Sequence, residues 1–512
     1  METEDLLIEQ LKRYGKSNRY PFHMPGHKRQ IHGVTEEFPN PYSIDITEIE
    51  GFDNLHHSEG ILKRSMEFAA QAYGADKTFY LINGSSSGIL SAIHGVTSYN
   101  SKIIIGRNCH KSAYHGIILN NLNPVYIYPQ IIEKMWINGG YFINSVENAL
   151  EENPDVKAVL LVSPTYEGIV SDIKKIAEIV HKKQIPLIID EAHGAHFSFG
   201  RSLFPASALD CGADIVIQSL HKTLPSFTQT AVIHVKSKYV DVERLEWYLQ
   251  VYQSSSPSYI LMAGIEKCIF EMYKWGEQYF TAFGIKLKSL RKRLGKMKHL
   301  RILDASVAEG CGVYDLDLSK IVVSCRGLSI TGVELAEILR EKYDLEMEMW
   351  GADYVVAITT ISDTNQGLER LEKAFLEIDE SLYGIFEERN REVCRNIDKN
   401  INELMNAKIF RESDKNILKN IGTEEKRWLK GPEIVMTLKT AMERKFETLS
   451  IEKCAGHVSR EFVYLYPPGI PIVVPGERVS EEMAKEIYKY KKMGFSVQGM
   501  ADKRAEYLQV IV

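Results

Sequence analysis

The sequence has little of what marks secreted, membrane or zinc proteins. Its seven cysteines are scattered without a single CxxC pair, which argues against a zinc site and a disulfide framework and suits a reducing cytoplasm. No apolar run approaches the about 18–20 residues that span a bilayer. The opening METEDLLIEQLKR lacks the parts of a signal peptide and is typical of an amphipathic helix. We therefore expect a cytoplasmic protein with no membrane partner and no metal.

Excess positive charge is absent as well. The chain has 62 lysines and arginines against 68 acidic residues, a net charge of -6, and this balance gives no reason to expect a nucleic-acid partner. At 512 residues it is too long for one core, and two to four domains are expected. A content of 44% hydrophobic and 25% charged residues is typical of a globular protein.

Short apolar runs alternate with helical patterns between residues 78 and 235. The runs are TFYLI (78–82), KIIIG (102–106), KAVLLV (157–162), PLIID (186–190), DIVIQ (214–218) and AVIHV (231–235). Continuous rather than alternating apolar residues indicate strands that helices cover on both faces. The sequence thus predicts an α/β fold with a mostly parallel, doubly wound sheet, whose ligand lies at the carboxyl ends of the strands.

The character of the chain changes after residue 305, where two strand-like runs flank the helical TGVELAEILR (331–340). Residues 375–425 are charged and helical in pattern, and a last helix begins after Ser480 with acidic residues in its first turn. The predicted parts are an N-terminal segment (1–60), a large domain (61–305), a small α/β domain (306–380), and a helical linker with a C-terminal α+β domain (381–512).

Four polar features follow the predicted strands. They are the loop NGSSSG (83–88), His110, Asp190 and Lys222. Each has a plain structural interpretation: a helix-capping loop, a structural histidine, an aspartate that caps a helix, and a lysine whose stem reaches past the strand to water. Each also has a chemical one, because a glycine-rich helix N-terminus binds anions and a buried lysine forms a Schiff base with an aldehyde. The loop is not a Walker motif, since no GK[ST] follows it.

Pyridoxal phosphate accounts for all four features together. It requires an anion cradle for its phosphate, a ring to stack on its face, a carboxylate at its ring nitrogen and a lysine for its aldehyde. The chain supplies these in the order phosphate loop, His110, Asp190, Lys222, which is the order of the aspartate-aminotransferase type of fold. A nucleotide enzyme would leave Lys222 and Asp190 without roles. We therefore predict pyridoxal phosphate as the cofactor.

Over nearly its whole length the chain resembles the bacterial ornithine/lysine/arginine decarboxylases of fold type I. The motifs that carry the resemblance are PFHMPGHK (21–28), DITEIEGFDNLHHSEG (45–60), RNCHKS (107–112), SPTYEG (163–168), DEAHGAH (190–196), SLHKTLPSFTQ (219–229) and AGHVSREFVYLYPPGIPIVVPGE (455–477). Any one motif is weak, but their order is that of the family. One departure is His457, which stands where many relatives have arginine.

The resemblance implies a role for each candidate site residue. Lys222 is the Schiff-base lysine, Asp190 pairs with the pyridine nitrogen, His110 stacks on one face of the ring with Ala192 beneath the other, and His193 lies near the substrate. The implied phosphate contacts are Ser85, Ser86, Ser219 and His221. Lys222, His193 and Asp190 are thus the implied catalytic residues.

The implied reaction is α-decarboxylation of a cationic amino acid in polyamine biosynthesis, with arginine first, giving agmatine and CO2, and lysine or ornithine close behind. The carboxylate for the side-chain cation is left open among Glu461, Glu477, Asp45 and Glu48, each of which is also typical of a surface acid or a helix cap. Whether an effector nucleotide binds is also left open. The alternatives are a fold-type I aminotransferase or β-lyase, with Arg326 for the substrate carboxylate, and a catalytically silent regulatory relative.

The resemblance also bears on assembly. Acid-induced members of the family carry an N-terminal wing domain that builds rings of dimers, and the PGHK motif here begins too early to leave room for one. We therefore expect a homodimer or a small assembly of dimers. The segment around residues 51–60 is our candidate for a contribution to the partner's site.

Overall fold

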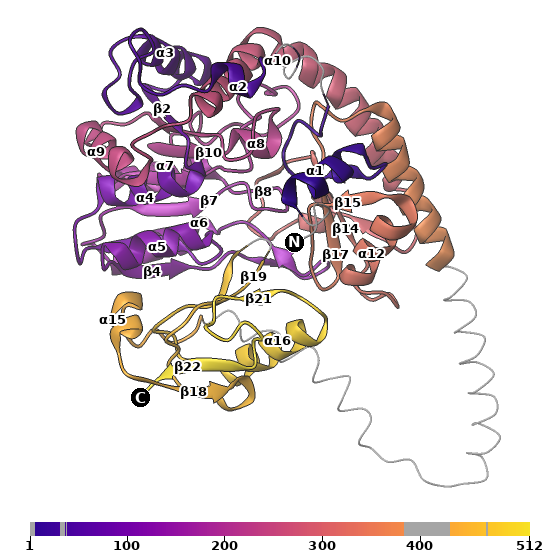
Figure 1. The fold of residues 1–512 in the computed structure, drawn as a ribbon. Helices are drawn as coiled ribbons and strands as arrows, with labels where there is room; N and C mark the ends of the chain where they lie inside the picture. The colour runs from indigo at the N-terminus through magenta and orange to yellow at the C-terminus, as the bar shows by residue number, and fades with distance from the viewer. Residues whose placement is uncertain (1–5, 31–35, 37, 383–430, 467–468) are drawn as a thin grey trace, which may run out of the picture.

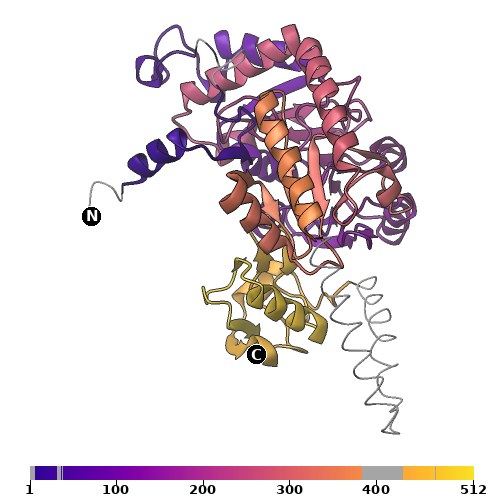
Figure 2. The same ribbon diagram turned by 90° about the vertical axis from the view of Figure 1, so that its right-hand side faces the viewer.

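The computed structural model describes residues 6–30, 36, 38–382, 431–466 and 469–512 (Figure 1). The predicted helical stretch 375–425 is helical up to residue 382, and its remainder lies outside the described residues. The N-terminal helix α1 (Leu7–Lys16) is present, as predicted, and projects from the body of the molecule (Figure 2). No described helix combines the length and the apolar character needed to cross a membrane.

A seven-stranded sheet forms the centre of the large domain. Its order is β2-β11-β10-β9-β7-β3-β4, and the pairs from β10 to β4 are parallel, whereas β11 is antiparallel to both of its neighbours. The strands are β2 (Lys77–Leu81), β3 (Lys102–Gly106), β4 (Asn123–Ile127), β7 (Val159–Val162), β9 (Leu187–Asp190), β10 (Ile215–Gln218) and β11 (Ala231–Val235). The six predicted strands are all among them.

Two hydrophobic cores lie on opposite faces of this sheet. In β3, Ile104 belongs to one core, whereas Ile103 and Ile105 belong to the other, as the alternation of side chains along a strand requires. Both faces are therefore covered, which is why the strands are apolar throughout. The helices around the sheet are α3 (Ile61–Tyr73), α4 (Gly84–Val96), α5 (Lys111–Leu119), α6 (Ile143–Glu152), α7 (Ile173–Lys182), α8 (Leu220–Thr223), α9 (Val242–Tyr252) and α10 (Tyr259–Leu294).

A second, antiparallel sheet of four strands follows α10 in the order β12-β14-β17-β16. Thr331 and Glu334 form a capping box at the start of its helix α12, which begins where the predicted helical run begins and extends three residues beyond its end. The N-terminal strand β1 (Tyr20–Phe22) pairs in parallel with β15 (Leu345–Met347). The other elements are β12 (Arg301–Ile302), β14 (Lys320–Ser324), α12 (Gly332–Tyr343), β16 (Met349–Trp350) and β17 (Tyr354–Ile358), and short strands β8 (Ile169–Val170) and β13 (Asp315–Leu316) pair nearby.

The C-terminal domain lies against the edge of the large domain near α5 and β4 (yellow in Figure 1). It has its own core and two small antiparallel sheets, β18-β22 and β20-β19-β21. Ser480 caps α16 by accepting a hydrogen bond from Met483 N, as predicted. The elements are α15 (Leu438–Glu443), β18 (Phe446–Ser450), β19 (Val463–Leu465), β20 (Pro471–Val473), α16 (Glu481–Lys492), β21 (Val497–Gln498) and β22 (Tyr507–Ile511).

Candidate cofactor and active site

The carboxyl ends of β2, β3, β7, β9 and β10 meet at one edge of the central sheet, because these strands run in the same direction. Asp190 is the last residue of β9, and its backbone is in register with Ile217 of β10. Lys222 lies on the short helix α8, four residues beyond the end of β10. The topology thus brings the predicted aspartate and lysine to the same edge.

The Lys222 ammonium is hydrogen bonded to His193, with 2.9 Å between Nζ and Nε2. Burial lowers the pKa of Lys222, and the negative charge of Asp190 opposes this shift. Burial also holds the pKa of His193 well below its usual range, so its ring is neutral and Nε2 accepts the lysine proton. His193 Nδ1 then carries a proton, and no described residue accepts it although the atom is buried. This leaves a donor free for a ligand.

Asp190 is buried with hydrogen-bonding capacity to spare. Within the described part of the chain one hydrogen bond reaches its carboxylate, from Ala192 N to Oδ1 at 3.1 Å. Burial raises the pKa of Asp190, and the Lys222 charge lowers it. A carboxylate with few partners in a buried place is costly unless a cation or donor joins it. A protonated pyridine nitrogen is such a partner.

His110 follows β3 and is the N-cap residue of α5. Its Nδ1 accepts from Ser112 N at 3.3 Å, so the proton of the neutral ring is on Nε2. Burial and the Lys222 charge lower the pKa of His110 to about 3. A neutral imidazole with electrostatic contact to Lys222 suits stacking on an aromatic ring.

The predicted phosphate cradle combines α4 and the residue that precedes α8. Ser85 Oγ, in the first turn of α4, lies 2.5 Å from Ser219 Oγ, whereas Ser86 is exposed. Asn83 precedes α4 but makes no side-chain cap, because its Oδ1 accepts from Ser254 N. The first N–H groups of the helix therefore remain available to an anion. His221, the fourth predicted contact, donates from Nδ1 to Thr230 O at 2.9 Å.

These features fit the group that the sequence predicts. The carboxylate with one partner, the buried His193 Nδ1 and the uncapped start of α4 are three unfilled polar positions of the kinds that a pyridine nitrogen, a substrate and a phosphate would fill. They surround one lysine whose pKa burial lowers. A lysine that merely passed the strand to reach water would need none of them.

Two further residues, to which the sequence assigned no role, line the same place. The Tyr166 ring lies 4.3 Å from the His193 ring and 6.0 Å from Lys222 Nζ. Tyr166 Oη donates to Glu348 Oε1, and Glu348 Oε2 accepts from Met24 N at 2.7 Å. The Glu348 charge raises the pKa of Lys222. The one signal in the sequence is the placement of Glu348 between apolar residues in LEMEMW (345–350).

The four acids proposed for the side-chain cation differ in availability. Glu477 forms a buried ion pair with Arg107. Glu461 accepts from the backbone at Ala501 and Gln509. Asp45 is exposed, and Glu48 is half-buried with Oε1 lacking a partner among the described residues.

Arg326, the candidate for a substrate carboxylate in an aminotransferase, pairs with Asp353 at 2.9 Å. His457, which stands where many relatives have arginine, makes a 3.3 Å contact from Nδ1 to Ala455 O within the C-terminal domain. Neither observation adds a group to the cluster around Lys222.

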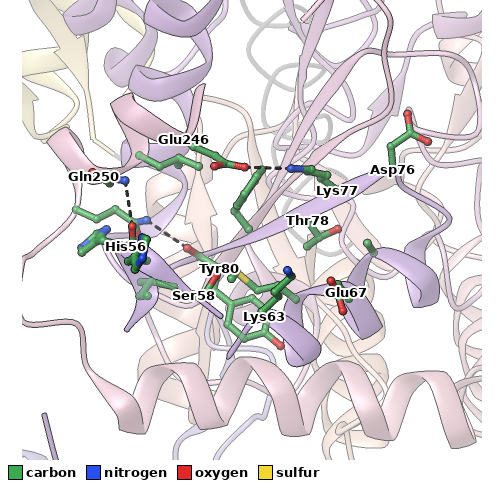
Figure 3. Close-up of a pocket in the computed structure, with 17 residues that line it drawn as sticks. His56, Ser58, Lys63, Glu67, Asp76, Lys77, Thr78, Tyr80, Glu246 and Gln250 are labelled. Carbon is green, nitrogen blue, oxygen red and sulfur yellow. Dashed lines mark hydrogen bonds and ion pairs between the residues drawn. The ribbon is translucent and has the colours of Figure 1, made fainter. Parts of the chain in front are cut away.

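A separate hollow lies between the segment 55–58, α3, β2 and α9 (Figure 3), with a cavity volume of about 480 Å³. Two of its charged groups pair with each other: Lys77 Nζ lies 3.2 Å from Glu246 Oε1. Gln250 Nε2 donates to His56 O at 3.0 Å. No residue of the predicted cofactor site is among the described residues that line it. This hollow is distinct from the cluster around Lys222.

Comparison with known proteins identifies the family. The model described as "Orn/Lys/Arg decarboxylase, major domain" matches residues 6–317, and the model of the family's C-terminal domain matches residues 423–499. The chain belongs to the Orn/Lys/Arg decarboxylase family. The predicted resemblance is therefore confirmed.

Relatives match the whole chain. An arginine decarboxylase of Bacillus subtilis (strain 168) is 31% identical over 100% of this chain and 98% of its own length. An arginine decarboxylase of Halalkalibacterium halodurans is 32% identical over 97% of this chain and 96% of its own. The structure of the constitutive lysine decarboxylase of E. coli superposes with a TM-score of 0.72 at 18% identity, covering 99% of this chain and 81% of that one. The predicted α/β fold is confirmed.

Proposed function

We propose that this Orn/Lys/Arg decarboxylase family member is a pyridoxal-phosphate-dependent decarboxylase that converts arginine to agmatine and CO2, a step of polyamine biosynthesis. The observation that carries the proposal is the buried cluster in which Lys222 Nζ contacts His193 at 2.9 Å beside the sparsely bonded Asp190. The full-length similarity to two arginine decarboxylases supports arginine over lysine and ornithine.

Each residue of the cluster has a task in this proposal. Lys222 binds the cofactor aldehyde, and Asp190 keeps the ring nitrogen protonated. His110 would cover one face of the cofactor ring, and Ala192 would lie against the other. Bound pyridoxal phosphate supplies an electron sink for the carbanion that remains when CO2 departs. His193 and Lys222 share a proton 2.9 Å apart, and we assign them its delivery to the substrate Cα.

We infer that Glu348 receives the side-chain cation of the substrate. Its carboxylate is held by Tyr166 Oη and Met24 N, and Tyr166 packs on His193 at the reacting end of the site. An arginine bound at Lys222 extends several ångströms from Cα to its guanidinium, so its distal charge needs an acid beyond the first ring of residues. Glu348 accepts from Tyr166 Oη, and its charge raises the pKa of Lys222, so this carboxylate favours a cation nearby.

A matched pair of variants tests this inference. Glu348→Gln is expected to lower kcat/KM for arginine about 10- to 100-fold, mainly through KM, because a charge-assisted contact is lost. Glu346→Gln is the control, because Glu346 lies two residues away and pairs with Arg340 at 3.0 Å instead. Equal kinetics for the two variants would contradict the role of Glu348.

We further propose a homodimer that forms through an apolar surface on α3 and α10. Phe270 and Tyr273 are 47% and 52% exposed, and Ile61 is 42% exposed on the adjacent helix. Helices α2 (Pro41–Ile44), α3 and α10 lie together at one end of the molecule (Figure 1). Exposed apolar residues gathered in this way are typical of protein interfaces. Analytical ultracentrifugation should give twice the chain mass, and Phe270→Glu should shift it toward the monomer; a monomeric wild type would contradict the dimer.

The function itself is tested by product formation. Purified protein loaded with pyridoxal phosphate is given arginine, lysine or ornithine separately, and the amines are measured by mass spectrometry. We expect agmatine to dominate and to vanish in Lys222→Ala. Cadaverine or putrescine as the main product would correct the substrate, and keto-acid products without any amine would overturn the decarboxylase assignment for this chain.

A further inference from the structure

A buried ion pair joins the C-terminal domain to the large domain. Arg107 Nη2 lies 3.0 Å from Glu477 Oε2, and Arg107 Nε lies 3.2 Å from Oε1, so the pair is bidentate. The two side chains are only 8% and 1% exposed. A buried pair with this geometry is costly to break from one side, because the remaining charge is left without a partner.

Further contacts fix the same guanidinium. Arg107 Nη1 donates to Pro471 O at 2.6 Å, and Nη2 donates to Ile472 O at 3.1 Å, both in the C-terminal domain. Tyr114 Oη, on α5, donates in turn to Arg107 O at 2.6 Å. The Arg107 side chain therefore joins strand β20 to the loop that follows β3.

That loop leads directly to His110, three residues further on. The C-terminal domain also contacts His110 itself: a side chain added at Gly469 would place its Cβ 3.5 Å from His110 Cδ2 and Nε2. Lys111 N donates to Gly469 O at 3.2 Å. Gly469 has a φ of +86°, which favours glycine. Val474 and Leu438 of the C-terminal domain share a hydrophobic core with α5.

We propose that the C-terminal domain forms a wall of the cofactor site, and that Arg107, Glu477 and Gly469 are positioning residues that hold the His110 ring against the cofactor. This inference rests on the proposed pyridoxal phosphate site. The large domain carries His110 and bonds its Nδ1 to Ser112, and residues 469–477 add the contacts to the Arg107 guanidinium before it and to the Lys111 N–H after it. Without the contacts from residues 469–477, the His110 ring could still stack on the cofactor but would no longer be held in one position.

Two glutamates of the C-terminal domain provide the test. Glu477→Gln breaks the buried pair, whereas Glu433→Gln breaks the exposed pair with Arg478, the next residue along the chain, at 2.6 Å. The dissociation constant of pyridoxal phosphate is measured by absorbance titration of cofactor-free protein. We expect Glu477→Gln to raise this Kd at least about tenfold, which is the effect of 1.4 kcal/mol, and Glu433→Gln to leave it unchanged. Equal Kd values in the two variants would overturn the proposal.

A double-mutant cycle separates positioning from general destabilisation. His110→Ala is expected to weaken cofactor binding, and Glu477→Gln should add little to it if the pair acts through His110. Fully additive effects would mean that the ion pair acts elsewhere. If Glu477→Gln fails to fold, Gly469→Ala gives the same test with the ion pair intact: it should raise the Kd in the wild-type background and not in His110→Ala.

The result also distinguishes this inference from the proposed function. Wild-type protein that shows no visible absorbance band from lysine-bound cofactor would refute the cofactor site and the wall together. A wild-type band with identical Kd values for Glu477→Gln, Gly469→Ala and the Glu433→Gln control would leave the cofactor site in place and refute the wall alone.

Discussion

Asp190 and Glu191 are consecutive carboxylates at the end of β9, and both are buried, at 5% and 1% exposure. Their surroundings differ because successive residues of a strand face opposite sides of the sheet. Asp190 accepts one hydrogen bond from the described residues and faces Lys222. Glu191 accepts three, from Ser207 Oγ, Ala208 N and Gln218 Nε2 at 2.8, 2.7 and 2.6 Å. Burial alone therefore does not mark a functional acid; unused hydrogen-bonding capacity beside a lysine does.

The side chains around Glu191 and those around Asp190, on the two faces of the sheet, differ in the same way. Behind Glu191, Gln218 Oε1 pairs with His234, whose other ring nitrogen meets Thr78 Oγ1 at 2.7 Å. These side chains are hydrogen bonded to one another, so this network needs no ligand. On the other side, Asp190, His193 and the start of α4 each keep an unfilled polar position.

The largest expected effect is that of Asp190→Asn on catalysis. Loss of the charge at the ring nitrogen should lower kcat about 10²- to 10³-fold, because the charge developed in the transition state loses its stabilising partner. The free energy of unfolding of the cofactor-free protein should change by less than about 1 kcal/mol, since a desolvated carboxylate contributes little to stability. Steady-state kinetics and urea unfolding measure the two quantities. A loss of stability with normal kcat would mean that Asp190 has a structural role and not a catalytic one.

The next effect is the pH dependence of stability that Glu191 produces. Burial raises the pKa of Glu191 from 4.5 to about 7, so the folded protein binds this proton more tightly than the unfolded chain. Its contribution to stability is therefore present at acidic pH and is lost as the pH rises through 7. Relative to Glu191→Gln, the wild type should lose on the order of 2–3 kcal/mol of unfolding free energy between pH 5 and 8. Parallel pH profiles of the two proteins would contradict this.

Glu191→Gln itself has a smaller effect. At pH 5 the variant should be less stable by about 1–2 kcal/mol, because the amide keeps only one accepting oxygen and turns its NH2 group toward groups that are themselves donors. Its kcat for arginine should stay within about threefold of wild type, since the side chain lies on the other face of the sheet. Chemical denaturation and kinetics on the folded fraction test this; a kcat as low as that of Asp190→Asn would show that the two acids act together.

The smallest expected effect is that of Ser207→Ala. It removes one of the three donors to Glu191 and should cost about 0.5–1 kcal/mol of unfolding free energy without changing kcat. Thermal and urea unfolding would detect it. A cost above that of Glu191→Gln would mean that the Ser207 hydroxyl has a more important partner than Glu191.

Much of the fold and the centre of the site followed from local patterns. Apolar runs long enough for a strand identify the buried sheet. Residues at the end of such a run, or a few residues beyond it, must lie near a strand end, which is how Asp190, His110 and Lys222 could be brought together before the structure. Local patterns could not reveal Glu348 or Tyr166, because their contact joins the bend between β15 and β16 to a loop of the large domain. Nor could it tell that Glu477 is engaged by Arg107, 370 residues away in sequence.

Lys28, Lys320 and Lys222 are buried or half-buried lysines of this part of the molecule, and of these three only Lys222 has the surroundings that a Schiff-base lysine requires. Lys28 donates to His23 O at 2.7 Å, and Lys320 pairs with Asp317 at 3.0 Å. Lys222 alone among the three contacts His193 and feels Asp190 as its main opposing charge. Burial lowers the pKa of Lys28 to about 8, so Lys28 is the rival to test.

The most direct test is borohydride reduction of the protein loaded with pyridoxal phosphate, followed by proteolysis and mass spectrometry of the peptides. We expect a reduced cofactor on the peptide that contains Lys222, and none in Lys222→Ala. A cofactor fixed to Lys28 or Lys320 in the wild type, or no covalent adduct at all, would contradict the central role of Lys222.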